Sequence, residues 1–505
     1  MKIDNMNKIQ REKIKKNRVY LYGFVTVVLL IASVRMLLLS KFSFDEYFTI
    51  NLIRNSWTDV IRFTALDVHP PLYYLVVKLV VTIFGEHFFS WHMTSFVCFL
   101  CMLFVTERFV TENYGEKEGS YAVLALCAAP HMLRYCLQVR MYSMAMLFVT
   151  WAFYLTYDLL AQYGIFSGKG AEQTDRRKCI RTWAGLAIVN VAAAYTHYFA
   201  GVAVAGLSLF LLLFLLLRGG AGRGRRLLHW LCFCAAMTLS YLPWLFVLVR
   251  QMGDIQGNYW IRRLNMETLW AYWDMLFGMS SDVLRICLIL LFVAGAYCLF
   301  VRSRTERDAW RWGSFFAAGF LLLFGVGYSV LRTPILIDRY LIVLVPMLWV
   351  SVLLALLEKR EKWIEIVLLV VFGFCFVQNA DALYQEYAAV ENSEETRCLK
   401  DNMEAGDVFY HTNVQRLAER AAFLPQTTHL LQEGCDAGEA FHYWTEMIGC
   451  REVPDAAAVM AIAGDVVWCE DDECLETFTR AGWQVEEYPA WSVTFYRLTR
   501  PSSDK

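Results

Sequence analysis

The sequence predicts a polytopic α-helical membrane protein that ends in a smaller α/β domain. The chain of 505 residues is 57% hydrophobic and only 19% charged. Soluble globular chains average about 45–50% apolar and about 25% charged residues. The apolar excess lies in runs of about 20 residues, the length that spans a bilayer as a helix. After about residue 381 the apolar runs shorten to strand length, which indicates a separate domain.

The apolar runs predict about eleven full crossings. The first run is too long for a cleavable signal, and no small-residue cleavage site follows it. Clusters of Lys and Arg at the N-terminus, 161–180, 218–226, 302–309 and 358–362 favour a cytoplasmic position for these segments. Loops 41–90, 195–199, 250–283 and 332–338 then lie outside. The expected crossings are 19–40, 91–111, 118–136, 138–160, 181–197, 199–217, 227–249, 284–301, 310–331, 339–357 and 363–380.

The segment 70–85 is apolar but short. Its fifteen or so residues reach only about 22 Å as a helix, less than the hydrocarbon layer. We expect a short, tilted or partly inserted helix here. A full crossing would reverse every later loop unless a second short or broken crossing restored the parity, so the total lies at about 11–13 membrane helices.

Three domains follow from this frame. Residues 1–18 form a basic cytoplasmic N-terminus, 19–380 form the transmembrane domain, with 41–90 as its first outer loop, and 381–505 form an extracytoplasmic α/β domain. The localisation expected is a plasma membrane, crossed several times; the resemblance described below implies a bacterial one. The strands expected in the last domain are 407–411, 428–432, 465–470, 483–488 and 492–498, with helical stretches between them.

Five of the 15 cysteines lie in this last domain. Disulfides form outside the cytoplasm, so Cys435–Cys450 and Cys469–Cys474 are candidate pairs, with free buried thiols as the alternative. The other cysteines lie in or near membrane helices and lack the spacing of zinc ligands. The net charge of -1 and the absence of a basic stripe argue against a nucleic-acid partner.

Polar residues from separate segments fall on the outer side of the membrane in this topology. Ionisable groups at the edge of a membrane protein are costly unless they are used. We expect Asp45 and Glu46 to be catalytic and the others to bind substrate or lipid phosphate. The set is Asp45, Glu46 and His69 in the first outer loop, then Arg140, Tyr142, His197, Tyr198, Trp260, Arg339 and Tyr340.

Each of these residues also has a structural explanation. Asp45 can be a solvated helix end, and His69 can fix the Pro70–Pro71 turn. His197 can be a packed turn histidine. The arginines can be interfacial side chains whose charges reach water, and Trp260 can be an ordinary aromatic of the membrane interface.

A sugar carried on a polyprenyl phosphate is a donor that suits this set. Its phosphate leaves as a weak base, so a carboxylate is needed to take the proton of the acceptor hydroxyl. Arginine or a metal ion is needed to hold the phosphate. The residues alone also allow a membrane transporter or flippase, which uses carboxylates and arginines as well, or a non-catalytic scaffold.

The ordered motifs SFDEYFT, DVHPPLYYLVVKL, VRMYSMAML, THYFA and DRYLIVLVP resemble those of GT-C glycosyltransferases. The pattern, over roughly residues 20–350, is most similar to family 39-like enzymes, the bacterial relatives of protein O-mannosyltransferases and aminoarabinose transferases. The resemblance implies a GT-C fold, a polyprenyl-phosphate sugar as donor, an extracytoplasmic acceptor and inversion at the anomeric carbon. No nucleotide cofactor is implied.

The same resemblance assigns roles to residues. It implies that Asp45 is the base, paired with Glu46, and that the arginines of the Arg140–Tyr142 and Arg339–Tyr340 elements serve the lipid phosphate. Oligosaccharyltransferase relatives bind a divalent ion at this loop. A metal site would use Asp45, Glu46, Asp67 and His69, and arginines alone are the alternative. The acceptor, whether glycan, lipid or protein, stays open.

Overall fold

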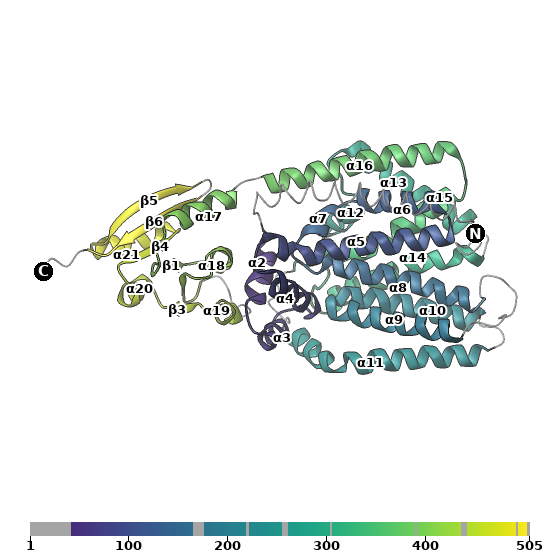
Figure 1. Cartoon of the computed structure of the whole chain (residues 1–505), viewed down its shortest axis with the longest axis horizontal. Coiled ribbons are helices and arrows are strands. Elements are labelled where there is room, and N and C mark those ends of the chain that lie inside the picture. Colours follow the sequence, from purple (N-terminus) through teal and green to yellow (C-terminus); the bar gives the residue numbers. More distant parts are fainter. Residues whose placement is uncertain are drawn as a thin grey trace. The chain divides into compact units, whose positions relative to one another are not determined.

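The computed structural model describes residues 42–501, except for 165–175, 219–221, 255–260, 303–305, 389–390, 436–441 and 491–492. The chain divides into two compact units, whose helices and strands are drawn in Figure 1. The first unit contains Asp67–Val76 and His92–Leu383. The second contains 42–66, Val77–Trp91 and the chain from residue 384 onward. The predicted segments 1–18 and 19–40 and the candidate Trp260 lie outside the described residues.

Eight helical segments of the described chain are long and apolar enough to cross a membrane. Large apolar side chains such as Phe246, Leu323 and Phe374 are exposed on them, as expected for surfaces that face lipid. The chain is therefore a multi-pass membrane protein. The segments are α5 (Phe88–Asn113), α8 (Tyr142–Gln162), α10 (Tyr198–Arg218), α11 (Arg223–Asp254), α13 (Asp282–Tyr297) with η2 (Cys298–Arg302), η3 (Glu306–Arg311) with α14 (Trp312–Leu331), η4 (Asp338–Leu344) with α15 (Val345–Leu357), and α16 (Lys362–Ala388).

One predicted crossing, 118–136, is not a continuous helix. The structure has α6 (Glu116–Ala128) and α7 (Met132–Leu137) there, separated by a short turn. Pro130 explains the break, because it lacks an N–H donor and disfavours helical backbone at the residue before it. Ala129 is accordingly extended (ψ 145°), and His131 takes a left-handed conformation (φ 60°).

Three further helices complete the described helical segments between residues 67 and 390. The predicted crossing 181–197 is α9 (Arg176–Thr196), whose first turns carry several basic residues. Helix α12 (Met266–Phe277) precedes α13. The predicted short helix at 70–85 is confirmed as α4 (Leu72–Phe84), whose 13 residues span about 20 Å.

The second unit is built on a six-stranded sheet of order β3-β2-β1-β4-β6-β5. Strands β1 to β4 are parallel to one another along the order β3-β2-β1-β4, and β6 and β5 add antiparallel strands at one edge. The predicted α/β domain is thereby confirmed. The strands are β1 (Val408–His411), β2 (Thr428–Gln432), β3 (Arg451–Val453), β4 (Val466–Cys469), β5 (Gln484–Ala490) and β6 (Val493–Thr499).

Alternating side chains of these strands form a core on each face of the sheet. Val408, Tyr410 and Leu430 belong to one core, while Phe409 and Trp468 belong to the other. Helices cover the strands, as the sequence of β and α segments requires. They are α17 (Glu391–Asn402), α18 (Val414–Phe423), α19 (His442–Ile448), α20 (Ala456–Ile462) and α21 (Leu475–Arg480), with the 3-10 turn η6 (Asp472–Cys474).

Neither predicted disulfide is present. No disulfide joins Cys435 to Cys450 or Cys469 to Cys474. The thiol of Cys474 lies 3.1 Å from the sulfur of Cys469, well beyond the bond length of about 2.05 Å. Both predicted pairings are therefore wrong.

Two helices from the predicted outer loop 41–90 belong to the second unit and pack on its C-terminal helices. They are α2 (Phe44–Ile53) and α3 (Trp57–Leu66). The side chain of Arg54 donates to the carbonyl oxygens of Ala421 and Ala422 at 2.8 and 2.7 Å. These carbonyls end α18, where helical carbonyls lack partners within the helix. Sequence analysis did not foresee that this loop and the last domain form one unit.

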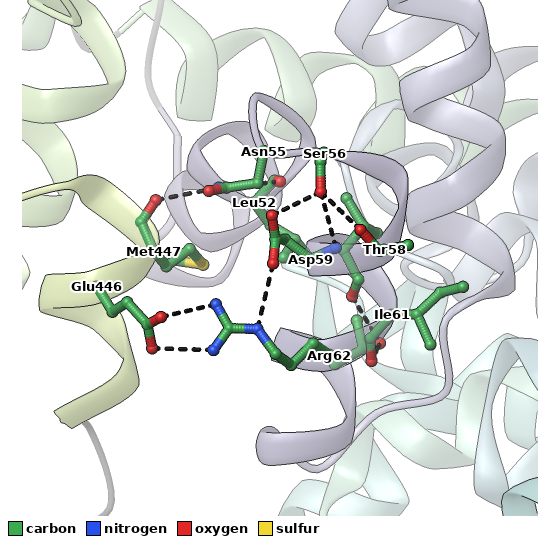
Figure 2. Close-up of polar contacts among 11 residues, drawn as sticks. Leu52, Asn55, Ser56, Thr58, Asp59, Ile61, Arg62, Glu446 and Met447 are labelled. Atoms are coloured by element: carbon green, nitrogen blue, oxygen red, sulfur yellow. Dashed lines mark hydrogen bonds and ion pairs between the residues drawn. The ribbon is translucent and has the colours of Figure 1, made fainter.

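A second set of contacts joins α3 to α19 (Figure 2). Arg62 forms a two-pronged ion pair with Glu446, with N–O distances of 3.1 and 2.8 Å. Asn55 donates to the carbonyl oxygen of Met447 at 3.0 Å. Polar contacts and aromatic packing, such as the stacking of Phe44 on Trp444 at 4.9 Å, together hold the loop helices against the domain.

Candidate functional site

A chain of polar side chains runs through the first unit from the loop before α4 to the turn before α8. The Nδ1 atom of His69 lies 2.8 Å from a carboxylate oxygen of Asp67. Its Nε2 atom lies 3.4 Å from a guanidinium nitrogen of Arg140. A carboxylate only accepts and a guanidinium only donates, so these contacts fit a neutral His69 with its proton on Nδ1. Arg140 also donates to the hydroxyl of Tyr74 at 3.0 Å.

The side chains of this hydrogen-bonded group are buried, so the interactions between their charges are only weakly screened by water. Arg140 is 1% exposed and His69 is 8% exposed. Burial on its own raises the pKa of Asp67, but the interactions with His69, hydrogen bond included, and with Arg140 outweigh it, so the pKa of Asp67 lies below its usual value. Asp67 is therefore an anion at neutral pH, and it balances the buried guanidinium.

The turn that carries Arg140 is fixed by backbone contacts. Ser95, in α5, donates to the carbonyl oxygen of Gln138 at 2.6 Å, and its hydroxyl lies 2.8 Å from that of Tyr73. The imidazole of His92 is hydrogen-bonded to the carbonyl oxygen of Leu137. These contacts hold the non-helical segment between α7 and α8 against the beginning of α4.

Aromatic rings surround the second histidine of the site. His197 lies between α9 and α10 and is 2% exposed. Its ring centroid is 4.8 Å from that of Tyr340, 5.9 Å from that of Tyr142 and 6.3 Å from that of His69. Burial, together with the neighbouring His69, Arg140 and Arg339, holds the pKa of His197 well below the usual value for histidine. His197 is thus neutral at physiological pH.

Residues of α11 that sequence analysis did not single out complete the site. The amide of Gln251 donates to the carbonyl oxygen of Asp67, and its oxygen accepts from the hydroxyl of Tyr198. The indole of Trp244 donates to the same hydroxyl at 3.0 Å. In the sequence, the one indication that Gln251 has such contacts is that a glutamine lies near the end of a long apolar helix. Gln251 thereby connects the Asp67–His69 loop to α10.

A cavity of about 570 Å³ opens beside these groups within the first unit. Its polar end is formed by His69, His197, Tyr198, Gln251 and Tyr340. The rest of its lining is mainly apolar and comes from α9, α10, α11 and α14; it includes Val202, Ala205, Met237, Leu245, Leu248, Phe320 and Phe324. An apolar cavity with a few polar groups at one end suits an amphipathic ligand.

The predicted catalytic pair lies in the second unit, on the first turn of α2. Glu46 is buried, and its carboxylate accepts from the backbone N–H and the hydroxyl of Ser43, both at 2.9 Å. It forms a capping box that fixes the start of the helix. Asp45 is half-buried beside it. Asp45 and Glu46 thus stand on a well-defined helix end.

The structure brings His69, Arg140, Tyr142, His197, Tyr198 and Tyr340 together in the first unit. Arg339, half-buried in η4, directly precedes Tyr340, whose ring centroid lies 4.8 Å from that of His197. Among the described residues, no group of three or more His, Cys, Asp or Glu side chains is arranged to hold a metal ion. The metal site at Asp45, Glu46, Asp67 and His69 stays a prediction.

Comparison with solved structures finds similar architectures. The chain is similar to ArnT from Cupriavidus metallidurans in the apo state and bound to undecaprenyl phosphate, each with a TM-score of 0.63, 12% identity, and coverage of 94% of this chain and 98% of that one. It also matches the Archaeoglobus fulgidus oligosaccharyltransferase, with a TM-score of 0.47, 10% identity and coverage of 95% and 74%. No protein-family model and no curated protein matches. The likeness to ArnT shows that the chain has the GT-C fold.

Proposed function

We propose that this GT-C-fold protein is an inverting glycosyltransferase that moves a sugar from a polyprenyl phosphate to an acceptor outside the cytoplasm. The observation that carries the proposal is the apolar cavity whose polar end contains His69 and His197, with Arg140 hydrogen-bonded directly behind His69. The similar ArnT structure was solved with undecaprenyl phosphate bound. A cavity of this composition suits a lipid chain that ends in a charged phosphate.

The arginines supply the charge that the leaving group needs. When the bond between the anomeric carbon and the phosphate oxygen breaks, negative charge grows on the lipid phosphate. Arg140 contacts His69 at 3.4 Å, and Arg339 directly precedes Tyr340, whose ring centroid is 4.8 Å from that of His197. Both arginines therefore adjoin residues that line the polar end of the cavity. Preorganised cations in a buried site stabilise such charge more than they would in water. Neutral His69 and His197 add hydrogen-bonding groups without competing for a proton.

The acceptor hydroxyl supplies the nucleophile. Its oxygen bonds to the anomeric carbon from the face opposite the phosphate, its proton passes to a carboxylate, and polyprenyl phosphate leaves with the bonding electron pair. We assign the proton acceptor to Asp45 on its resemblance to the family's motif. Glu46 serves as a positioning residue, because its capping box fixes the helical turn on which Asp45 stands. Substitution of Glu46 by Gln would keep part of that cap.

The test is transfer by the purified full-length protein. Undecaprenyl phosphate carrying a labelled sugar is incubated with the protein and membranes of the source bacterium, and label that leaves the lipid fraction is measured. We expect Asp45→Asn to reduce this transfer by at least about 100-fold, with unchanged thermal unfolding. Asp59→Asn, on the exposed side of α3, is the matched control and retains activity. Full activity of Asp45→Asn would remove Asp45 as the base.

The same assay separates the proposal from a transporter. A flippase would move the labelled lipid across a vesicle membrane but leave the sugar attached to it. Translocation without loss of the sugar, in both the native chain and Asp45→Asn, would therefore contradict glycosyl transfer and favour transport.

A further inference from the structure

Helices α9, α10 and α11 of the first unit run alongside one another (Figure 1). The ring centroids of Trp183, in α9, and Phe233, in α11, are 5.4 Å apart. Further along both helices, the hydroxyl of Tyr195 donates to the carbonyl oxygen of Ser240 at 3.0 Å. The contacts advance in the same direction, so α9 and α11 are parallel and begin at the same end. Helix α10 runs the other way and ends there.

This common end of α9 and α11 is basic. The chain from Arg176 to Gly253, which includes nearly all of the three helices, contains no Asp or Glu. The helices packed against them, α8 and α14, contribute one carboxylate, that of Asp158. Four arginines of the first turns are exposed, and none of them has an ion pair among the described residues. This arginine cluster consists of Arg176 and Arg181 on α9 and Arg223 and Arg225 on α11.

Exposed aliphatic side chains continue from the arginine cluster along the same helix faces. Ile180 lies four residues after Arg176, and Leu228 lies three residues after Arg225, spacings that place each pair on one face of its helix. Ile180 is 55% exposed and Leu228 is 57% exposed. Only 11% of the apolar part of α11 is buried inside the protein. The arginines therefore stand at the edge of a surface that faces lipid.

The helix ends that carry the arginine cluster are fixed relative to one another by Tyr163, which ends α8. The indole of Trp183 in α9 donates to its hydroxyl at 2.7 Å, and Nδ1 of His229 in α11 lies 3.2 Å from the same hydroxyl. The guanidinium of Arg226, buried in α11, lies 4.8 Å from the centre of its ring. The arginine cluster is thus carried by rigid elements, as a preorganised binding site requires.

An anionic phospholipid matches both features of this surface. Its phosphate accepts the paired hydrogen bonds that a guanidinium group donates, and the beginnings of α9 and α11 add the positive ends of two helix dipoles. Its acyl chains match the exposed aliphatic faces. A soluble anion would use only the first feature, and a lipid without net charge would use only the second. Basic groups between membrane helices bind anionic head groups in this way.

We propose that the arginine cluster binds the head group of an anionic phospholipid, whose acyl chains lie along the exposed aliphatic faces of α9 and α11. The lipid is a component of the surrounding bilayer and not a substrate. The site lies wholly in the first unit, at the end of α10 remote from Tyr198 and the polar end of the cavity. It does not depend on the glycosyltransferase activity proposed above.

Native mass spectrometry of the full-length protein in detergent tests the proposal. The probes are phosphatidylglycerol, phosphatidylcholine with the same acyl chains, and soluble glycerol phosphate. We expect phosphatidylglycerol to bind with a Kd at least about tenfold lower than that of phosphatidylcholine, and the difference to shrink as the salt concentration rises. Equal affinity for the two phospholipids would overturn the proposal. Displacement of phosphatidylglycerol by an equal concentration of glycerol phosphate would also overturn it, because the site would then recognise phosphate alone.

Two double variants locate the binding. Arg223→Gln with Arg225→Gln removes the cluster's charge from α11, and Arg176→Gln with Arg181→Gln removes it from α9. Each is expected to weaken binding of phosphatidylglycerol by at least about tenfold and to leave binding of phosphatidylcholine unchanged. All four side chains are exposed, so the unfolding temperature without added lipid should not change. If one double variant fails to fold, the other still tests the site.

The matched control removes the same charge from another position. Arg262→Gln with Arg263→Gln changes two exposed arginines that lie between α11 and α12, beyond the opposite end of α11. This variant should bind phosphatidylglycerol as the native chain does. Native binding in a folded double variant of the arginine cluster, or equal weakening in the control, would show that the lipid is not held at the beginnings of α9 and α11.

Discussion

The side-chain amide of Asn51, in α2, donates a hydrogen bond to the carbonyl oxygen of Ala418, in α18, at 2.8 Å. Both residues are buried, and 367 positions of sequence separate them. The helix that carries Asp45 is therefore fixed to the C-terminal domain by a contact shielded from water. The position of Asp45, the predicted base, therefore depends on contacts with the C-terminal α/β domain, which contains none of the predicted catalytic motifs.

The first prediction concerns this contact. Asn51→Ala removes the donor and leaves a buried carbonyl group, which we expect to lower the stability of the second unit by about 1–3 kcal/mol. Arg62→Ala breaks an ion pair whose side chains are 46% and 59% exposed, and such exposed pairs contribute little to stability because water screens them. Denaturant unfolding followed by tryptophan fluorescence measures both. A larger loss for Arg62→Ala than for Asn51→Ala would contradict the assignment.

The fold could be predicted from the sequence wherever one physical requirement dominated. Apolar runs such as 199–217 had to be membrane helices, because a bilayer leaves the backbone no other way to satisfy its hydrogen bonds. The strands at 407–411 and 428–432 were indicated by their length and composition. Strand β3 was missed, since its three residues are too few to show a period. The broken helix at 118–136 was missed although Pro130 marks the break.

The sequence allowed the identity of several site residues to be predicted, but not how they are arranged relative to one another. His69, Arg140 and His197 could be singled out, because charged and imidazole groups at the end of apolar runs are costly. Their distances could not be predicted, since these depend on how separate helices pack. Gln251 and Tyr74 were missed for the same reason. The capping of α2 by Glu46 could have been found, because Ser43 and Glu46 have the spacing of a capping box.

The second prediction tests whether both terminal nitrogens of the Arg140 guanidinium are needed. Its two terminal nitrogens contact different partners, the hydroxyl of Tyr74 and the imidazole of His69. Lysine keeps the charge but has a single nitrogen, so it cannot reproduce this arrangement. We expect Arg140→Lys to lower sugar transfer by about 10- to 100-fold, equivalent to about 1.4–2.8 kcal/mol.

The matched control for that variant is Arg108→Lys. Arg108 pairs with Glu112 on the surface of α5, and its side chain is 60% exposed. This variant should transfer sugar as the native chain does. Tyr74→Phe, which removes one of the two partners of Arg140, should have an intermediate effect. Native activity in Arg140→Lys would show that charge alone is needed at this position.

The third prediction concerns the partner of His69. Asp67→Asn keeps an oxygen that accepts from Nδ1 of His69 but removes the negative charge, whereas Asp67→Ala removes both. We expect transfer to fall by about tenfold in the first and by about 100-fold in the second, because only alanine leaves a buried N–H group unpaired. Initial rates at saturating and limiting donor separate the effect on kcat from that on KM. Equal activity of the two variants would show that the hydrogen bond itself does not matter.

The fourth prediction is a pH dependence within the α/β domain. His411, in β1, and His429, in β2, are buried, and their ring nitrogens lie 2.9 Å apart. His429 also contacts the carbonyl oxygen of Leu424 at 3.1 Å. Burial is the main cause that lowers the pKa of both, to about 4 for His429 and well below the usual value for His411. For His411 the neighbouring His429 and Arg420 add to this effect. For His429 the hydrogen bond to Leu424 opposes it and the charge of Arg54 adds to it.

The sign follows from proton binding. Below the ordinary histidine pKa of 6.5, the unfolded chain binds protons that the folded domain excludes, so the stability present above pH 6.5 is lost as the pH falls toward 4. For His429 this loss is on the order of 3 kcal/mol. Hydrogen exchange of β1 and β2 in the full-length protein should quicken over that range. The double variant His411→Phe, His429→Gln should show a flatter dependence; an equally steep one would assign the effect to other groups.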